Sequence, residues 1–472
     1  MKTIVIDPVT RIEGHAKITI RLDDEGGVAD TRFHVTQFRG FEKFTEGRPY
    51  YEMPSITARI CGICPISHLL ASVKACDAIM AIKPPPAAAK LRELLHCGQI
   101  TQSHALSFFL LSGPDIVLGF DSDPATRNMV GLIDKYPDIA KDGIALRKFG
   151  QQVIALLAGE RIHPSWTVPG GVNSPLKASV RDEILAGLPA AKKIAKSGLA
   201  LLKRAVDDFE EEMTAFGSMA TMHAGLVDRN GDLQLYDGDL RFVSANGEIA
   251  VDRMTGADYQ QYIGEATVPD SFLKAPYFKP LGYPEGAYRV GPLARLNVAA
   301  RCATEESDKE FFEYHQRFGK TPQSTFLYHY ARLIELLYAL ERMEALLNDP
   351  IILDRHVRAQ AGVNALEGIG MVEAPRGVLL HHYKVNEDGA IVWANLIVAT
   401  GHNNIAISRN VKECATHYIS GKKITDGMLN RVQGVLRAYD PCLSCSTHAS
   451  NSYALDVRLL DTDGSVLDSR RT

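Results

Sequence analysis

The chain lacks several features that would place it in a particular class of protein. Its 8 cysteines among 472 residues are too few for a disulfide scaffold of this size. No segment reaches about eighteen uncharged apolar residues, so no membrane-spanning helix is predicted. The net charge of −4 lacks the basic excess of a nucleic-acid-binding protein. The N-terminus reads as a short strand and not as a signal peptide, but a partner subunit could carry an export signal for both, so this absence does not fix the compartment.

What the sequence does contain fits a large globular protein of mixed secondary structure. Hydrophobic residues make up 46% and charged residues 23%, which is ordinary for such a protein. At 472 residues the chain is long for one core, so several domains or large insertions are expected. Alternating runs predict N-terminal strands at 2–7, 15–22 and 28–36. Helical spacing of apolar residues predicts long helices at 67–80, from 84 to about 110, and near 141–158, 190–216 and 324–348.

Turn signals between and after these helices predict further hairpins. Asn230-Gly231 and Asn246-Gly247 lie in a stretch, about 220–300, that is richer in aromatic and β-branched residues. Asp388-Gly389 is expected to join strands at 379–385 and 391–398, and Asp463-Gly464 to turn a last hairpin near the C-terminus.

Together these patterns predict an α+β fold. We expect a central bundle of long helices, a small N-terminal antiparallel sheet and peripheral α/β insertions. The chain is expected to divide into the N-terminal sheet with a loop at 7–15 (1–53), a helical bundle (54–216), an α+β insertion (217–323), a bundle helix with a hairpin (324–448) and a C-terminal extension (449–472).

Two short cysteine motifs stand at opposite ends of the chain. Cys61 and Cys64 are followed by His68, and Cys442 and Cys445 are followed by His448. A C-x-x-C motif brings two sulfurs close enough to bind one metal ion. Spacing alone favours a structural zinc site with four cysteines, whereas an iron–sulfur cluster or a nickel and iron site also suits four thiolates. A thiol–disulfide pair is less favoured, because neither motif lies in a thioredoxin-like context.

The residues around the two motifs favour a catalytic metal over a structural one. Asp440 directly precedes the second motif, and a loop carrying Arg11 and Glu13 adds further polar groups. A structural zinc site needs no such neighbours, but a catalytic metal needs groups that transfer protons and orient its ligands. No glycine-rich fingerprint for a nucleotide is present.

The two cysteine motifs resemble the signatures of the large subunits of [NiFe]-hydrogenases. Three further stretches are similar to motifs of that family and occur in the same order: Arg11-Ile12-Glu13-Gly14-His15, Arg39-Gly40-Phe41-Glu42 and Ala374-Pro375-Arg376-Gly377. The resemblance covers essentially the whole chain and implies the fold of that family. It also implies a nickel–iron centre whose iron carries carbon monoxide and cyanide.

The resemblance implies a role for each residue of the motifs. Cys61 and Cys442 would be terminal nickel ligands, and Cys64 and Cys445 would bridge nickel and iron. The remaining residues would hold or surround the cofactor: His68, bonded to a bridging sulfur; Pro375, Thr400 and Ser103 at the cofactor pocket; and Glu42, His448 and the carbonyl near Ile397, which would bind a structural magnesium ion.

The implied reaction is the heterolytic cleavage of dihydrogen. The group that takes the proton would be the thiolate of Cys442 or the guanidine of Arg376, and Glu13 would relay the proton outward. Many family members have an aspartate where this chain has Ser103, so Asp440 is expected to act there alone.

The resemblance also implies partners. A dedicated endopeptidase would cut between His448 and Ala449 after maturation proteins insert nickel. Hydrogen-sensing relatives generally lack such an extension, so its presence favours a catalytic enzyme. Electrons would pass to an iron–sulfur subunit, because Cys76, Cys97, Cys302 and Cys414 are scattered singly and indicate buried structural thiols. The sequence around these motifs is most similar to the cytoplasmic NAD-reducing group, which implies a cytoplasmic protein. In that group, diaphorase subunits carry further iron–sulfur clusters and flavin. NADP-linked, deazaflavin-reducing or heterodisulfide-reductase-linked enzymes are alternatives, and so is a non-catalytic zinc-stabilised subunit or a hydrogen sensor.

Overall fold

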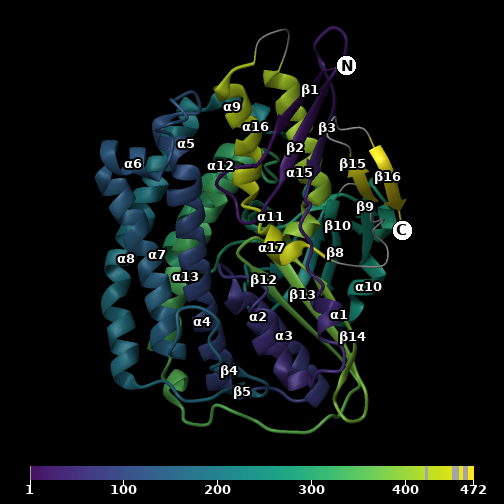
Figure 1. Cartoon of the computed structure of the whole chain (residues 1–472). Helices are drawn as coiled ribbons and strands as arrows, with labels where there is room; N and C mark the ends of the chain where they lie inside the picture. The colour runs from purple at the N-terminus through teal and green to yellow at the C-terminus, as the bar shows by residue number, and fades with distance from the viewer. Residues whose placement is uncertain (1, 270, 420–423, 449–455, 461–465, 472) are drawn as a thin grey trace.

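The computed structural model describes residues 2–269, 271–419, 424–448, 456–460 and 466–471 (Figure 1). Within these ranges, the longest helices stand along one side of the molecule, and most of the small sheets lie with shorter helices on the other. None of the helices in the described part of the chain is long and apolar enough to cross a membrane. The expected α+β fold is therefore confirmed, including its small N-terminal antiparallel sheet.

Four long helices form the bundle on one side. They are α4 (Pro86–Ala105), α7 (Pro137–Ala158), α8 (Ala178–Asp208) and α13 (Tyr328–Asn348). The helix α13 packs against α4 and α8, and α7 packs against the same two helices. Their apolar stripes are buried, which is what the helical spacing in the sequence predicts. The helix α8 begins near 178 and not near 190, because Pro189 lies inside it and does not end it.

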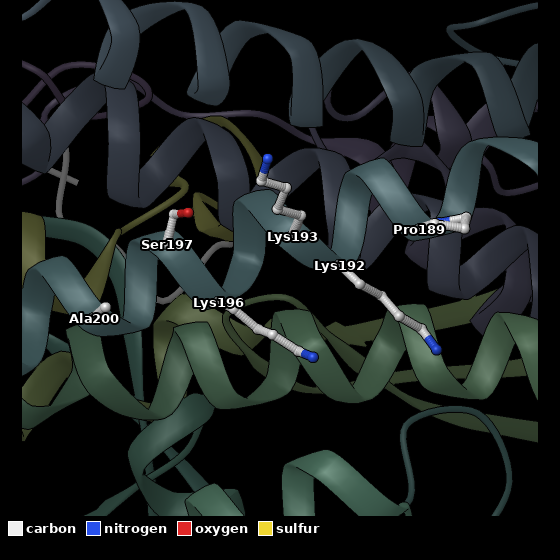
Figure 2. A pocket seen from close by; sticks show the side chains of 6 residues that line it. All are labelled: Pro189, Lys192, Lys193, Lys196, Ser197 and Ala200. Atoms are coloured by element: carbon white, nitrogen blue, oxygen red, sulfur yellow. The ribbon is translucent and has the colours of Figure 1, made fainter.

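Lysines on α8 form ion pairs with neighbouring helices. Lys192 and Lys196 line a surface groove together with Lys193 (Figure 2). Lys192 forms an ion pair with Glu344 of α13, and Lys196 forms one with Glu306 of α12 (Glu305–Phe318). These exposed pairs contribute little stability each, and they hold α8 against the rest of the bundle.

Six small sheets are present in the part of the chain that the structure describes. The N-terminal sheet has the order β1-β2-β3, a second has the order β11-β6-β7-β8 and a third has the order β12-β13-β14; the pairs β9–β10, β4–β5 and β15–β16 are the others among the described residues. The strands are β1 (Lys2–Ile6), β2 (Lys17–Leu22), β3 (Val28–His34), β4 (Thr167–Val168), β5 (Gly171–Val172), β6 (Met222–Val227), β7 (Asp239–Val243), β8 (Ile249–Met254), β9 (Ile263–Val268), β10 (Ser271–Phe278), β11 (Tyr288–Arg289), β12 (Glu367–Ala374), β13 (Gly377–Val385), β14 (Ile391–Ile397), β15 (Asp456–Leu460) and β16 (Val466–Arg471).

The hairpins predicted at Asn246-Gly247 and Asp388-Gly389 are present. β7 and β8 pair antiparallel around Asn246-Gly247, and β13 and β14 pair antiparallel around Asp388-Gly389. β15 and β16 also pair antiparallel, although the expected turn at Asp463-Gly464 lies outside the described residues. The bond between His448 and Ala449, where cleavage is expected, reaches the same boundary, because Ala449 lies outside them.

Shorter helices connect these elements, and three of them, α1, α3 and α17, carry Glu42, His68 and Cys445. They are α1 (Phe41–Phe44), α2 (Met53–Ala58), α3 (Pro65–Met80), α5 (Gly113–Leu118), α6 (Met129–Lys135), α9 (Glu210–Ala215), α10 (Tyr259–Tyr262), α11 (Pro292–Val298), α14 (Ala399–His402), α15 (Asn404–Tyr418), α16 (Asp426–Tyr439) and α17 (Leu443–Ser446). Between α4 and α5 the chain forms a π-helical segment, Leu106–Ser112, of the kind often found beside functional sites.

The helix α3 lies directly on the sheet β12-β13-β14. The two elements approach so closely at Gly370 that an added Cβ would lie 1.9 Å from the carbonyl oxygen of Ala71. A glycine is therefore required on β12 at this point. This contact fixes α3, which starts next to the first cysteine motif, against β13, which starts next to Arg376.

Candidate metal centre

The fold brings the two distant cysteine motifs together. The Sγ atoms of Cys61 and Cys442 lie 3.3 Å apart, as do those of Cys64 and Cys445. The four sulfurs all lie within 4.8 Å of one another, and each residue is at most 4% exposed. Hydrogen bonds from the Cys442 and Cys445 thiols lower the pKa of Cys61, whereas burial raises the pKa of Cys442 and Cys445 themselves. Four convergent, buried sulfurs form a donor set for soft metals.

The first motif is held by its own backbone and by α4. Cys64 directly precedes α3, and the amides of Ile63 and Cys64 donate to the Cys61 sulfur at 3.2 and 3.3 Å. Gln99 and Gln102, one turn apart on α4, both donate from Nε2 to the Ile63 carbonyl, at 2.7 and 2.6 Å. The loop between the two cysteines is thus fixed both by its own backbone amides and by two side chains of α4.

The second motif follows a sharp turn at the end of α16. Asp440 adopts the left-handed conformation (φ 56°, ψ 56°) that ends this helix, which aspartate tolerates better than most residues. The chain then runs extended through Cys442, whose amide donates to Thr400 Oγ1 at 2.9 Å. Thr400 therefore lies beside the second motif and contacts its backbone.

Glu13 reaches the second motif from the loop between β1 and β2. The Leu443 amide donates to the Glu13 carbonyl at 3.1 Å, and the Ser444 amide donates to Glu13 Oε2 at 2.9 Å. The next residue, Gly14, has φ +84°, and an added Cβ would lie 2.7 Å from the Cβ of Leu443. Only glycine allows the loop to approach this closely, so Gly14 determines where Glu13 lies.

Arg376 and Asp440 form a buried ion pair beside the sulfurs. Arg376 Nη2 lies 3.0 Å from Asp440 Oδ1, and Arg376 Nε donates to the Asp440 carbonyl at 2.5 Å. Burial disfavours charge on both groups, but the Asp440 carboxylate and the nearby thiols hold the pKa of Arg376 well above its ordinary value. Arg376 is therefore a cation in this structure. Ser103 Oγ lies 3.4 Å from Arg376 Nη1, so it also faces this group.

A second arginine holds the turn that carries Arg376. Arg295 of α11 donates from Nη2 to the Pro375 carbonyl at 3.0 Å and from Nη1 to the Ala374 carbonyl at 2.9 Å. Arg295 is itself fully buried between Glu335 and Glu373. Pro375 thus contributes its backbone to the support of this turn, between β12 and β13.

Glu42 and His448 meet at the C-terminal end of the second motif. His448 Nδ1 lies 2.5 Å from Glu42 Oε1. Burial acts to raise the pKa of Glu42, but the adjacent His448 outweighs it and lowers that pKa below its ordinary value. Ile397 ends β14, the strand against which α1, the helix of Glu42, packs.

Several residues near the sulfurs have no signal in the sequence. His163 Nε2 lies 2.9 Å from the Cys61 carbonyl, and His68 Nδ1 lies 3.1 Å from His381 Nε2. Gln99 and Arg295 belong to the same group, because they act on backbone carbonyls far away in the chain. Only a three-dimensional structure identifies such contacts. The other four cysteines are all buried and unpaired, as expected.

Comparisons with known proteins agree with this geometry. A family model described as nickel-dependent hydrogenase matches residues 39–129 and 236–448, and one described as HoxL-like matches residues 3–38. The chain is 46% identical over 418 residues to a subunit of the vhu F420-non-reducing hydrogenase of Methanocaldococcus jannaschii, covering 88% of this chain and 99% of that protein. It is 40% identical over 487 residues to the NAD-reducing hydrogenase HoxS subunit beta of Cupriavidus necator, covering 99% of each.

Solved structures give the same result. A crystal structure of NAD+-reducing [NiFe]-hydrogenase in the H2-reduced state matches with a TM-score of 0.92 and 44% identity, over 95% of this chain and 100% of that chain. The Ni-Fe-Se hydrogenase from D. vulgaris Hildenborough matches with a TM-score of 0.76 at 24% identity, over 95% of this chain and 100% of that chain, and indicates a shared fold alone.

Proposed function

The chain belongs to the nickel-dependent hydrogenase family as a catalytic large subunit, and on this basis we propose that its complex couples the reversible cleavage of dihydrogen to NAD. The observation that carries the hydrogenase function is the cluster of four buried thiols joined from both ends of the chain. Membership of the family implies a nickel–iron centre there.

The donor set fits such a centre. Four sulfurs in a buried, enclosed group provide the soft ligands that nickel and iron accept. We propose that Cys61 and Cys442 would hold nickel, and that Cys64 and Cys445 would hold nickel together with an iron carrying carbon monoxide and cyanide. The structural zinc alternative requires only the four thiols, and it leaves the buried Arg376–Asp440 pair beside them without a role.

When bound, the metals supply the Lewis acidity that polarises dihydrogen so that a proton can be removed. The residues of the chain then handle charge and protons. Arg376 is a cation held by Asp440, so it stabilises negative charge near the sulfurs and is a poor base there. This favours the Cys442 thiolate as the group that first takes the proton.

Glu13 is the acid–base group best placed to take the proton onward. Its carboxylate bonds to the backbone of the second motif, two residues after Cys442. A half-buried carboxylate in this place can receive a proton from the sulfurs and release it at the protein surface. We propose that Glu13 is the exit of the proton route.

Glu42 and His448 fit part of a second metal site. A carboxylate oxygen and an imidazole nitrogen meet there at 2.5 Å, and the carbonyl of Ile397 would add an oxygen ligand. We propose a structural magnesium or similar ion at this position. A Glu42→Gln variant should then lose that ion while it keeps nickel, as measured by metal analysis of the purified complex.

The electrons require a partner subunit. Relatives of the chain are named as subunits of hydrogenases, one of them as an iron-sulfur subunit. Two exposed aromatic residues, Phe38 and Phe44, are each 58% exposed. Phe38 packs on Phe272, whose carbonyl accepts the His448 amide, and Phe44 is on α1, whose Glu42 meets His448. We propose that an iron–sulfur subunit covers this surface and that diaphorase subunits follow it, in the cytoplasm.

The NAD acceptor is supported by likeness to NAD-reducing enzymes over nearly the full chain. A second acceptor is supported by the 46% identity to an F420-non-reducing hydrogenase, although over 88% of this chain. The two are separated by measuring dihydrogen-dependent reduction of NAD by the purified complex. An active complex that reduces artificial dyes but not NAD would exclude the first acceptor and keep the hydrogenase.

Maturation by proteolysis is the last part of the proposal. We propose that maturation proteins insert nickel and that an endopeptidase then removes residues 449–472. The mass of the chain from cells grown with and without nickel tests this, since only nickel-loaded chains should end at His448.

The experiment that tests the main function is an infrared spectrum of the anaerobic complex. One carbonyl band and two cyanide bands, with nickel in the protein, are expected for a hydrogenase. A zinc-loaded protein without these bands would return the thiols to a structural role, and a nickel-loaded complex that binds dihydrogen without turnover would be a sensor.

A further inference from the structure

The ion pair of Arg376 and Asp440 joins two turns that are far apart in the sequence. Arg376 lies in the turn between β12 and β13, and Asp440 ends α16. The pair depends on the backbone as well as on side chains, because Arg376 Nε donates to the Asp440 carbonyl at 2.5 Å. A shift of either turn would therefore move the guanidinium relative to its carboxylate. Both turns are held from one buried helix, α13.

The first turn is held from α13 through Arg295. Glu335 of α13 accepts from Arg295 Nε at 2.6 Å and from Arg295 Nη2 at 2.5 Å, a two-point contact that fixes the plane of the guanidinium. The other three N–H groups of Arg295 donate to the carboxylate of Glu373 and to the carbonyls of Ala374 and Pro375. All five donors of Arg295 are thus used, and this turn cannot move without breaking some of these bonds.

The same carboxylate also fixes α4. His104 Nε2 donates to Glu335 Oε2 at 2.9 Å, and the residue before it, Ser103, has its Oγ 3.4 Å from Arg376 Nη1. Burial lowers the pKa of His104 to about 4, so its ring is neutral. Burial acts to raise the pKa of Glu335, but Arg295 and His104 outweigh it and lower that pKa, so Glu335 is an ionised acceptor. Glu335 therefore sets where α4 meets Arg376 as well as where the first turn lies.

The second turn is held from α13 by Arg332. Arg332 precedes Glu335 by three residues, so the two lie on the same face of α13. Arg332 Nη2 donates to the Ala438 carbonyl at 2.8 Å, in the last turn of α16 and two residues before Asp440. Its Nη1 lies 3.3 Å from Nδ1 of His329 on the same helix. A cation at the C-terminal end of a helix also interacts favourably with the helix dipole, so Arg332 stabilises this turn.

We propose that Glu335 and Arg332 are positioning residues that hold the guanidinium of Arg376 against the carboxylate of Asp440. This inference rests on the proposed function, because it takes that ion pair to act beside the metal centre. Glu335, Arg332 and the intervening Arg295 are at most 1% exposed, so bulk water does not replace a bond that is lost there. Neither positioning residue touches a reacting atom. Their effect is geometric, since a displacement of about 1 Å at a group that acts on the reaction can cost about 10²-fold in rate.

The first test replaces Arg332 by methionine in the complete complex. Methionine is also long and unbranched, but it has neither the charge nor the N–H groups, and Asp440 keeps Arg376 as its partner. Burial lowers the pKa of Arg332 to about 10, which reflects the cost of burying its charge, and an apolar side chain of similar volume avoids that cost. Arg332→Met should therefore keep its nickel and unfold close to the wild-type temperature. Its dihydrogen oxidation should nevertheless fall about 10–100-fold.

The second test is Glu335→Gln, which has a matched control on the same helix. Glu341 lies six residues further along α13 and is 9% exposed, and its carboxylate accepts bonds from the amide and the hydroxyl of Ser307, at the start of α12. Both Glu335→Gln and Glu341→Gln remove the charge of a carboxylate with several donors, so both should lower the unfolding temperature. Only Glu335→Gln should lower turnover, by about 10–100-fold, and both should retain nickel.

Infrared spectra give a readout that a general loss of stability does not change. A cation displaced beside the metal centre alters the electric field at the carbonyl and cyanide groups. The bands of Arg332→Met and Glu335→Gln should therefore move from the wild-type positions, and those of Glu341→Gln should stay. The inference requires moved bands together with reduced turnover in the nickel-loaded variants, and it is overturned if either is missing. An equal loss of turnover in Glu341→Gln would also overturn it, because the role would then be structural.

The remaining outcomes are also decisive. If the wild-type complex shows no carbonyl or cyanide bands, the proposed function fails first and the inference fails with it. If Glu335→Gln does not fold, Arg332→Met decides alone, since its unfolding temperature is expected to be close to that of the wild type. If the wild type has its bands but neither variant takes up nickel while Glu341→Gln does, the two residues serve assembly of the centre and the inference is overturned.

Discussion

Replacing Glu13 by glutamine tests the proton route with little change to the structure. Glutamine has the same shape, and its amide oxygen can still accept the bond that the Ser444 amide gives to Glu13 Oε2 at 2.9 Å. The backbone bond from Leu443 to the Glu13 carbonyl does not depend on the side chain. What the variant loses is the capacity to take up and release a proton.

The structure allows the two effects of this change to be estimated separately. A hydrogen bond to a charged group contributes about 1.5–3 kcal/mol and a neutral one about 0.5–1.5 kcal/mol, so stability should fall by only about 1–2 kcal/mol. A positioned acid–base group contributes about 10²–10⁴-fold in rate, or about 3–5 kcal/mol of barrier. Turnover should therefore fall far more than stability does.

The assay is dihydrogen oxidation with an artificial electron acceptor, measured beside nickel content and thermal unfolding. Glu13→Gln should retain its nickel and unfold at nearly the wild-type temperature, with turnover reduced by about 10²–10⁴-fold. Glu25→Gln, in the exposed turn between β2 and β3, is the control and should be fully active. Full turnover in nickel-loaded Glu13→Gln would show that the proton leaves by another route.

Three further predictions concern residues that form or support the site. Gly14→Ala should lower both turnover and stability, measured by the same assays, because its Cβ would lie 2.7 Å from a neighbouring side chain and its φ is positive. Cys442→Ser should contain no nickel by metal analysis, whereas Cys302→Ala should keep it. Asp115→Asn should destabilise the chain by about 3–5 kcal/mol in denaturant unfolding, since it leaves Arg437 buried without its carboxylate. Burial acts to raise the pKa of Asp115, but the charge of Arg437 outweighs it and lowers that pKa, so the stability from this pair is present above about pH 4 and lost below it, and the variant should lack that loss.

Much of the fold could be predicted because the local patterns agree with the final packing. The three N-terminal strands and the long bundle helices follow the period of their apolar residues. The strand β12 is not predicted, because Gly368 and Gly370 interrupt the pattern of a strand. These glycines are present so that α3 can lie against the strand, and that contact is not visible in the local sequence.

Some residues of the site can be predicted from sequence motifs, and others cannot. Cysteine spacing reveals the four thiols because metal binding requires that residue type at that spacing. Gln99 and His163 act on the carbonyls of Ile63 and Cys61, and any residue type can supply a carbonyl. The partner of such a bond therefore leaves no trace in the sequence, and only the fold reveals it.

The separation of the paired thiols has a consequence for synthesis of the protein. Cys61 and Cys442 are 381 positions apart. At about 5–20 residues per second, a ribosome needs roughly 20–80 s to make the intervening chain. During that interval the first pair of thiols waits without its partners, exposed to oxidants and to stray metal ions. A cell that makes this enzyme must keep those two thiols reduced and unoccupied until the last helices emerge.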